Sequence, residues 1–409
     1  MKTTYVINYF SMNVGGIENY LAQIVENGLE RGCRVIWLCD AEYDLSPVYA
    51  HLMDDPRVEK CRCSNHGFRW FAHEKLTFSP GERVVIFSCS FFDQMRALQL
   101  RWDFPEAQVI PLCLVPHFLG SDLYPEAAFS GIWKRFVRNF AKEAFAQWQK
   151  YGWLYCFSQK HFDVIEERYG LHIAPEDRKI VPLLRENSDF SREEAVNRYE
   201  AEDFTIISPG RLEFPHKGFA LGLLREYAKL KSRYPRLKLK FIGEGDGEEV
   251  LRRELAGMAE AVSQDVEILP MMPFEQLCEE YKKAQLNISV AGCASAGAKL
   301  GVITLPARHY TYECEVYGFF PESRPFTTET KPGEPVAPYI ERVLHMSREE
   351  YLALSRKAYD TMADKKPDRD HFLRLEAAEG PKVTKKTIRE AYAILMGQRM
   401  LYKLHLLKE

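Results

Sequence analysis

Short apolar runs alternate with stretches of helical periodicity along the whole chain. In the first half the runs are YVINYF, RVIWLC, RVVIFS, AQVIPLCLV, LYCFS and KIVPLL, and a second series follows with TIISPG, LKLKFIGEG, VEILPMM, LNISVAG and GVITLP. Runs of this length, separated by helices, are typical of buried parallel strands in open α/β sheets. Two series of such runs predict two α/β domains, each with its own parallel sheet.

A polar segment separates the two series. Residues 185–203, RENSDFSREEAVNRYEAED, are charged and poor in strand-forming residues, as segments between domains are. This predicts a first domain over residues 1–190 and a second over 200–384. The last segment, KTIREAYAILMGQRMLYKLHLL, is long and amphipathic, and we expect residues 385–409 to return to the first domain.

The composition is that of a globular protein. The 409 residues are 46% hydrophobic, which is enough to bury a large core in two domains. The 55 lysines and arginines are finely mixed with 58 aspartates and glutamates, and the net charge is -3. Because this balance predicts no broad basic surface, we expect no nucleic-acid partner.

The ten cysteines lie within apolar segments rather than in a compact framework, so we expect reduced thiols and a cytoplasmic protein. The one close pair, Cys61 and Cys63, has CxC spacing, and no second pair follows at zinc-finger spacing, which argues against a metal site. No run of about 18 apolar residues predicts a membrane span. We also expect no cleavable leader, because the sequence enters a strand-like run directly.

A strand-to-helix turn in the second half holds two cations. In SPGRLEFPHKGFALGLL (Ser208–Leu224), Arg211 and Lys217 lie between an apolar run and an amphipathic helix. Two prolines stiffen this turn, two glycines including Gly210 relax it, and it leads to a helix N-terminus. The combination predicts a phosphate site. The alternative for either cation alone is a solvated surface side chain.

Glycines form a second turn, in the first half. In NYFSMNVGGIENYLAQIVENGLERG, Gly15 and Gly16 lie between the first strand and a helix with a 3.6-residue apolar period. Backbone amides at that helix start can approach an anion or a sugar closely. Neither this turn nor GEGDGEE in the second half has the GxGxxG spacing of a dinucleotide loop, and a turn without a ligand is the alternative.

A histidine follows one of the most apolar predicted strands. His117, in PLCLVPHFLGSDL, lies at the carboxyl edge where open α/β sheets bind ligands. It either contacts a substrate there or satisfies a loop carbonyl.

Taken together, these motifs resemble a known family. GGIENYLAQIVENGLERGCRVIWLC, VPH, FSQ, SPGRL with HKG, FIGEGDGEEVLRREL and MPFEQLCEEYKKAQLNISVAG occur in the order and approximate spacing of the family 4 glycosyltransferases of GT-B fold. The resemblance covers roughly residues 1–365 and rests on short motifs, of which the Arg211 and Lys217 pair is the strongest. It implies two Rossmann-like domains facing each other across a cleft. The first would hold the acceptor and the second a nucleotide-diphosphate sugar.

The resemblance also implies roles for single residues. Arg211 and Lys217 match the cations that grip the donor diphosphate, and His117 matches the histidine beside the reacting sugar; these three are the catalytic candidates. The residues expected at the donor are Gly15, Gly16, Gly210, Arg211, Lys217, Gly243, Ser295, Ala296 and Gly297. Such enzymes retain anomeric configuration.

No metal or other cofactor is expected, because fixed cations can stabilise the departing diphosphate. Asp368 and Asp370 have the DxD spacing of a metal-bridged diphosphate, but they lie in a polar stretch that is more typical of a solvated surface.

The family pattern breaks after the NISV run. Family members usually carry two glutamates in this region, one near the donor sugar and one at the ribose, whereas residues 287–306 contain no acid and Ala296 stands where the second belongs. Ser295 and the amides of the AGCASAGA loop can still bind a diphosphate at a helix start. Glu313 and Glu315 are the nearest substitute carboxylates, with solvent-facing side chains as the alternative.

One segment of the first half suggests a membrane surface. GIWKRFVRNFAKEAFAQWQKYGWLY (residues 131–155) contains five lysines and arginines and one acid among its aromatic residues. Such a helix can lie on an anionic bilayer and bring a lipid-linked acceptor within reach, as a peripheral protein at the inner face of the membrane. The alternative is a domain helix with its aromatic residues in the core.

The sequence therefore predicts a metal-independent, retaining glycosyltransferase. It would move a hexose-type residue from a nucleotide-diphosphate sugar to a glycan or lipid-linked acceptor, in bacterial surface polysaccharide assembly of the capsule or O-antigen type. The missing glutamates leave a second interpretation, a catalytically degenerate GT-B scaffold or binding subunit of a glycosyltransferase complex. A third, a nucleotide-sugar epimerase, needs acid/base carboxylates that the AGCASAGA loop does not supply.

Overall fold

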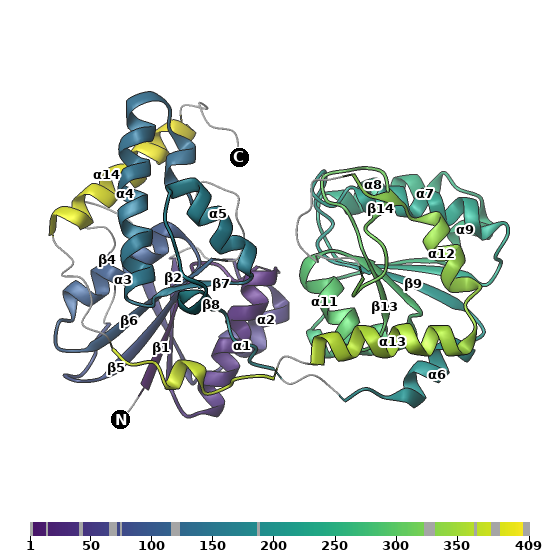
Figure 1. Cartoon of the computed structure of the whole chain (residues 1–409), viewed down its shortest axis with the longest axis horizontal. Helices are drawn as coiled ribbons and strands as arrows, with labels where there is room; N and C mark the ends of the chain where they lie inside the picture. Colours follow the sequence, from purple (N-terminus) through teal and green to yellow (C-terminus); the bar gives the residue numbers. More distant parts are fainter. Residues whose placement is uncertain are drawn as a thin grey trace. The chain divides into compact units, whose positions relative to one another are not determined.

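The computed structural model describes residues 3–13, 15–40, 44–64, 72–73, 76–115, 123–185, 189–322, 332–363, 366–377 and 385–403. The chain divides into two compact units (Figure 1). One comprises residues 1–185 and 367–409, and the other comprises residues 186–366. The second unit thus begins before residue 200, and the chain returns to the first before residue 385, so both boundaries lie earlier than predicted.

An eight-stranded sheet forms the first unit, in the order β4-β3-β2-β1-β5-β6-β7-β8. Neighbouring strands are parallel except β3 and β4. The strands are β1 (Thr3–Asn8), β2 (Arg34–Asp40), β3 (Val58–Ser64), β4 (Ala72–His73), β5 (Arg83–Ser88), β6 (Gln108–Val115), β7 (Leu154–Cys156) and β8 (Lys179–Ile180). The helices are α1 (Gly16–Glu30), α2 (Pro47–Met53), α3 (Phe91–Asp103), α4 (Gly131–Lys150), α5 (Gln159–Tyr169) and α14 (Lys385–Lys403), with short 3-10 turns η1 (Pro125–Ala128), η2 (Pro175–Asp177) and η3 (His371–Leu373).

Burial on both faces explains why the central strands are apolar throughout. Tyr5, Val6 and Ile7 of β1 are consecutive, so they point to alternate faces of the sheet, and all three are fully buried. Leu21 and Ile24 of α1 are buried as well, at the spacing predicted from the sequence.

Residues 367–377 complete the core of the first unit. Phe372 is fully buried, and its ring centroid lies 4.9 Å from that of Phe87 in β5 and 6.3 Å from that of Tyr155 in β7. Arg83 donates hydrogen bonds to two carbonyls of η3. The helix α14 then packs against α3 and η1 of the same unit. The return begins before residue 385 because this one aromatic residue, within a polar stretch, anchors it.

The second unit has a five-stranded parallel sheet in the order β11-β10-β9-β12-β13. Its strands are β9 (Phe204–Pro209), β10 (Leu237–Ile242), β11 (Val266–Leu269), β12 (Leu286–Ser289) and β13 (Ile303–Pro306), one in each predicted run. A short antiparallel pair, β14 (Glu315–Val316) and β15 (Glu334–Pro335), follows the sheet along the chain. The helices are α6 (Arg192–Glu200), α7 (Phe219–Lys231), α8 (Gly247–Ala256), α9 (Glu260–Ser263), α10 (Phe274–Lys283), α11 (Ala291–Lys299), α12 (Ala337–Leu344) and α13 (Arg348–Ala363).

Several elements were not anticipated from the sequence, among them strands β3, β4, β14 and β15 and helix α6. Strand β3 reads VEKCRCS, and its exposed Glu59 and Arg62 break the apolar run that marks the other strands. Helix α6 lies within the polar segment predicted to separate the domains, where Ala195 and Arg198 are buried. In both cases a few buried side chains are enough to hold an element that is mostly polar.

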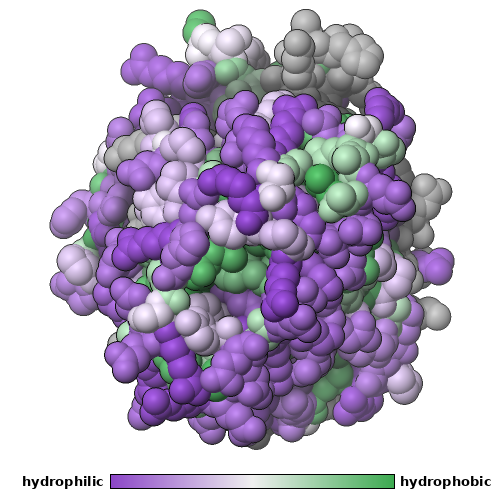
Figure 2. Space-filling model, turned by 90° about the vertical axis from the view of Figure 1, so that its right-hand side faces the viewer, coloured by the Kyte–Doolittle hydropathy of each residue, from purple (hydrophilic) through white to green (hydrophobic). Residues whose placement is uncertain are grey.

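Hydrophilic side chains dominate one face of the molecule (Figure 2). Among the described residues, no helix is both long and apolar enough to cross a membrane. On the face drawn in Figure 2, hydrophilic side chains predominate and interrupt the apolar groups.

Candidate functional site

The winding of the second sheet reverses at β9. From β9 the chain passes to β10 and β11 on one side, and then to β12 and β13 on the other. Open α/β sheets bind ligands outside the carboxyl ends of their strands at such a reversal. The turn that holds Arg211 and Lys217 follows β9 directly, so the sequence-predicted cations lie at this position.

Two glycine-containing loops are bonded together at this edge. The amide of Gly210 donates to the carbonyl of Ile242 at 2.9 Å, and the amide of Leu212 donates to that of Glu244 at 2.8 Å. A Cβ on Gly243 would lie 2.0 Å from the carbonyl oxygen of Gly210. Gly210 itself has φ +139°, a conformation that other residues rarely adopt. The turn after β9 is therefore closely held by the loop after β10.

Lys217 is placed against the backbone of this turn. Its amide donates to the carbonyl of Glu213 at 2.7 Å, and a Cβ on Gly210 would lie only 2.7 Å from its Nζ. Burial lowers the pKa of Lys217, the Cys293 thiol opposes that shift, and the charge of Arg211 adds to it. Within the described part of the chain, its ammonium has no hydrogen-bond or ion-pair partner. A half-buried, unpaired ammonium beside a second cation favours an incoming anion.

Arg211 is paired, by contrast. Its Nη1 lies 3.0 Å from Oε1 of Glu213, and the two side chains are 41% and 42% exposed. Glu213 was not singled out from the sequence. An acid two positions after the arginine, in the same short turn, was the signal that would have identified it.

Two histidines stack beside the cations, and neither was predicted. His216 Nε2 lies 2.8 Å from Nδ1 of His309, which follows β13, and the ring planes are 23° apart. Burial, then His216 and then Lys217 lower the pKa of His309 to about 3. Burial also lowers the pKa of His216, and Lys217 and Arg211 add to the shift against the opposing effect of Glu213. Both rings are thus neutral near pH 7, and no described group hydrogen bonds to the buried Nε2 of His309.

The N-terminus of α11 approaches the same turn. A Cβ on Gly210 would lie 3.7 Å from Sγ of Cys293, in the first turn of this helix. The amides of Ala291 and Gly292 precede the first intrahelical bond, and a Cβ on Gly292 would meet nothing within 4 Å. Open amides at a helix N-terminus next to Lys217 form a suitable place for phosphate oxygens.

Farther along α11, the predicted donor residues differ in exposure. Ser295 is half-buried, whereas Ala296 belongs to an apolar cluster under the sheet. A Cβ on Gly297 would lie 2.4 Å from the side-chain nitrogen Nδ2 of Asn287 in β12, so Gly297 allows α11 to pack closely on that strand. The expected donor contacts of these three residues stay predictions.

The two candidate substitute carboxylates lie in the loop after β13. Glu315 pairs with Arg308 at 2.7 Å and accepts the amide of Gly333 at 2.9 Å. Burial is the largest single influence on the pKa of Glu315 and raises it. The interactions with Arg308 and Gly333 together outweigh burial, so the pKa of Glu315 is lowered. Glu313 is exposed and lies near Arg225 of α7. A role for either in binding hydroxyl groups stays a prediction.

In the first unit, Gly15 is the N-cap of α1 and has an extended backbone. The carboxylate of Glu18 folds over it: a Cβ on Gly15 would lie 2.3 Å from Oε2, and the hydroxyl of Tyr9 donates to Oε1 at 3.2 Å. Gly16 has open space around its Cα. His117 lies outside the described residues, so the structure gives it no position.

Asp368 and Asp370, which have DxD spacing, both form ion pairs within the first unit. Asp368 pairs with Arg374 and His371, and Asp370 lies 3.0 Å from Arg31. Over the residues that the structure describes, no three acids, histidines or cysteines gather as metal ligands do.

The two ends of helix α4 differ in how far their apolar side chains are exposed. In its first turns Ile132 is 88% exposed, Trp133 68% and Phe136 45%, whereas Phe145 and Trp148 farther along are buried. Neither alternative drawn from the sequence therefore holds for the whole helix, because its start projects aromatic side chains and its end packs into the core.

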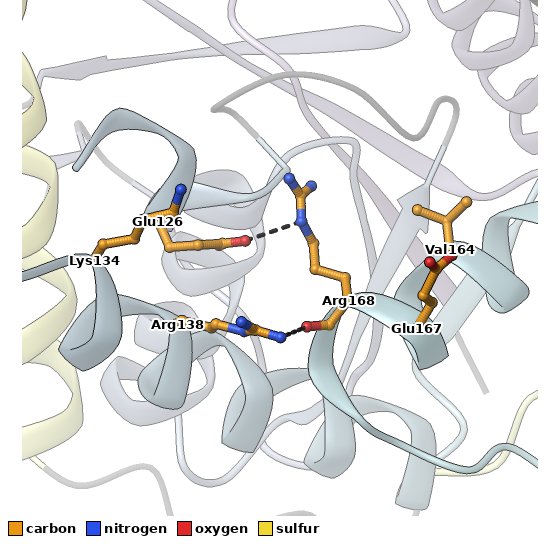
Figure 3. A pocket seen from close by; sticks show the side chains of 6 residues that line it. All are labelled: Glu126, Lys134, Arg138, Val164, Glu167 and Arg168. Carbon is orange, nitrogen blue, oxygen red and sulfur yellow. Dashed lines mark hydrogen bonds and ion pairs between the residues drawn. The ribbon is translucent and has the colours of Figure 1, made fainter. Parts of the chain in front are cut away.

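An open cavity of about 360 Å³ lies beside the exposed start of α4 (Figure 3). Arg168 points across it to Glu126, with Nε 3.1 Å from Oε1, and Arg138 donates to the carbonyl of Arg168. The hydroxyl of Tyr169 also donates to Glu126, at 2.9 Å. Lys134 and Glu167 also line the cavity, so three cations and two acids lie together there.

Comparison with solved structures identifies the fold. No family model matches the chain, and no curated protein matches it in sequence. Solved structures match it along nearly its whole length. HepE from Anabaena, in complex with UDP, has 13% identity over 97% of this chain and 100% of its own, with a TM-score of 0.56.

Two further structures are similar to the chain. A glycosyltransferase from Rickettsia africae has 11% identity, coverage of 96% and 98%, and a TM-score of 0.54. A UDP-forming α,α-trehalose-phosphate synthase from Burkholderia xenovorans has 13% identity, coverage of 91% and 98%, and a TM-score of 0.53. At these identities the likeness shows the fold. The chain has two α/β domains with parallel sheets in the GT-B fold, and the fold class predicted from the sequence is confirmed.

Proposed function

We propose that the protein is a glycosyltransferase that takes its sugar from a nucleotide-diphosphate sugar. The observation that carries this proposal is the turn after β9, where the unpaired ammonium of Lys217 and the guanidinium of Arg211 lie at the switch point beside the start of α11. Similar structures include HepE with bound UDP and a UDP-forming synthase, which supports a nucleotide ligand.

The chemistry of sugar transfer suits this charge arrangement. As the bond from the anomeric carbon to the diphosphate breaks, positive charge grows on the sugar and negative charge on the leaving group. Arg211 and Lys217, fixed in a closely bonded turn, would stabilise that negative charge in the transition state more than in the ground state. Retention of anomeric configuration and independence from metal ions are part of the proposal.

We further propose a lipid-linked glycan acceptor at an anionic membrane surface, in surface polysaccharide assembly. The exposed Trp133 and Phe136 lie on the same helix as Lys134 and Arg138, so apolar and cationic side chains are presented together. Such a surface can insert aromatic rings at the bilayer interface while its cations bind anionic headgroups. This would place the protein at the inner face of the membrane.

Calorimetric titration with UDP-, GDP-, dTDP- and CMP-sugars tests the nucleotide site. The wild type should bind one class of donor, and an Arg211→Ala, Lys217→Ala double variant should lose that binding. An Arg225→Ala, Lys229→Ala double variant is the matched control, because it removes the same charge from two exposed residues of α7 that pair with Glu254 and Glu226. Equal affinity in wild type and the 211/217 variant would refute the proposed site.

A scaffold or binding subunit of a glycosyltransferase complex is the second candidate. It is favoured by one observation, the absence of any acid between residues 287 and 306 in the loop and helix after β12. Nucleotide binding without sugar transfer to any acceptor, but with transfer restored by a partner protein, would favour this function over the first.

A further inference from the structure

Glu213 is an acid that contacts one of the two proposed phosphate cations, Arg211. Its Oε1 lies 3.0 Å from Nη1 of Arg211, and its Oε2 lies 3.9 Å from Nδ1 of His216. The carbonyl of Glu213 also accepts the amide of Lys217 at 2.7 Å. One turn therefore fixes an anion beside the guanidinium of Arg211, four positions before Lys217.

The other acids in the described loops at this edge have partners of their own. Asp246 and Glu244 each accept a hydrogen bond from a backbone amide, and Glu315 pairs with Arg308. Glu313 lies near a cation of α7 rather than near the turn. Among these acids, Glu213 is the one whose carboxylate pairs with a proposed phosphate cation, Arg211.

The carboxylate lowers the positive charge available to a ligand. Since His216 and His309 are neutral near pH 7, the turn carries the charges of Arg211 and Lys217 less that of Glu213. A ligand that places phosphate oxygens on Arg211 must share the guanidinium with Glu213 or displace it. The cost of that competition rises with the negative charge of the ligand.

Two ligands of the proposed reaction differ in this charge. The diphosphate of a nucleotide sugar is esterified at both ends and carries two negative charges. Transfer of the sugar frees the terminal phosphate, whose second pKa is near 6 as in other phosphate monoesters, so the nucleoside diphosphate gains most of a third charge near pH 7.

We propose that Glu213 is a specificity-determining residue of the nucleotide site, where its carboxylate disfavours the nucleoside diphosphate relative to the nucleotide sugar. The inference rests on the proposed function and deepens it. Its consequence is weaker product binding, so the departing nucleoside diphosphate competes less with the next donor.

Calorimetric titration of wild type and Glu213→Gln with UDP and UDP-glucose, and with GDP and GDP-mannose, tests this role. Glutamine keeps the shape of the side chain and removes its charge. We expect the substitution to raise affinity for the nucleoside diphosphate about 3- to 10-fold more than affinity for the matching nucleotide sugar, the range for a partly exposed charge a few ångströms away. The difference should shrink in high salt, because exposed charges are screened.

Glu249→Gln is the matched control, since Glu249 is an exposed acid of α8 paired with Arg253. It should leave both affinities unchanged. An equal change for the two ligands in Glu213→Gln would overturn the inference, as would a loss confined to the nucleotide sugar, which would make Glu213 a hydroxyl acceptor instead. If the donor is a dTDP-sugar, dTDP and that sugar replace these two pairs. If the wild type binds none of the UDP-, GDP- and dTDP-sugars, the proposed function itself fails and the inference with it.

Discussion

Arg211 and Lys217 are held differently before any ligand binds. Arg211 already has a counter-charge in Glu213, whereas Lys217 is half-buried and unpaired among the described residues. A phosphate on Arg211 therefore replaces one ion pair by another, but a phosphate on Lys217 forms a new one. The two cations are unequal at the level of single residues, although the sequence motif presents them as a pair.

Removing either cation should weaken donor binding. Arg211→Ala or Lys217→Ala should each cost on the order of 1.5 to 3 kcal/mol, the range for charged hydrogen bonds. This is roughly a 10- to 100-fold rise in Kd, to be measured by calorimetry against Lys229→Ala. Because Lys217 lacks a counter-charge to exchange, we expect the larger loss there; equal donor affinity in all three variants would contradict the prediction.

Gly210→Ala should act through Lys217. A methyl group at residue 210 would lie 2.7 Å from Nζ, and the φ of +139° is strained for alanine, so the ammonium must move. We expect donor affinity to fall at least several-fold, measured by titration. Gly257→Ala, at the end of α8 where the nearest neighbour would be 3.4 Å away, should bind donor normally.

His309 should make stability depend on acid pH. Its pKa is about 3 in the fold and near 6.5 when exposed, so the unfolded chain binds a proton that the folded chain does not. This contribution to the free energy of unfolding is complete above pH 6.5 and is lost as pH falls toward 3, with a slope of up to about 1.4 kcal/mol per pH unit. Urea unfolding from pH 7 to 4 should show a shallower slope in His309→Gln; an identical slope would refute this.

The sequence singled out the two cations of this turn but not its other charged and titratable groups. Arg211 and Lys217 were noticed because glycines, prolines and a following helix mark a strand-to-helix turn. An acid two positions after Arg211 was a signal for Glu213, but the direction of the His216 side chain cannot be read from spacing. His309 could not be found at all, because only the adjacency of the β13 loop and the β9 turn brings it there.

At the scale of elements, α4 combines two roles in one helix. Its later turns pack Phe145 and Trp148 into the core, while its start exposes Ile132 and Trp133 beside a cavity with three cations. A helix that served packing alone would gain nothing from exposing these residues, since burying a large apolar side chain is worth about 1.5 to 3 kcal/mol.

Vesicle co-sedimentation tests this surface. Lys134, Arg135 and Arg138 changed together to glutamine should lower affinity for phosphatidylglycerol vesicles by at least roughly 10-fold, at about 1 kcal/mol per cation. Glutamine at Arg225, Lys229 and Arg233 of the second unit should have little effect. Binding that ignores the α4 substitutions, or that is equal on neutral phosphatidylcholine vesicles, would contradict the prediction.

Strands that lie in mostly apolar runs were predictable from the sequence. Each apolar run of the second half contains a strand, and β9, β12 and β13 are buried along nearly their whole length, as strands covered on both faces are. Strand β3 and helix α6 were missed because charged side chains cover their outer faces and only a few residues are buried. Tertiary contacts, rather than local preference, stabilise both elements.

The whole molecule consists of one continuous unit and one assembled from both ends of the chain. Residues 186–366 contain their own sheet and core, whereas the first unit needs residues 367–377 and α14. Contacts within the first unit therefore join residues far apart in the sequence, such as Arg83 with η3. The stability of the two units can be perturbed separately.

Phe372→Ala should destabilise the first unit alone. The side chain is fully buried against Phe87 and Tyr155, so its loss should cost about 3 to 5 kcal/mol of unfolding free energy. In denaturant, the transition of the first unit should shift while that of the second stays in place. Met400→Ala, at a 60% exposed position, should shift neither; a common shift of both transitions would contradict this independence.

The split of the first unit also bears on how the protein is made. During synthesis, domains generally fold as they emerge from the ribosome, starting from the N-terminus. Here the first 185 residues emerge without Phe372 and α14, so their core is incomplete while the whole of the second unit is translated. The unit encoded by residues 186–366 can therefore complete its fold first, and the sheet of the other unit gains Phe372 and α14 only after that unit has been translated.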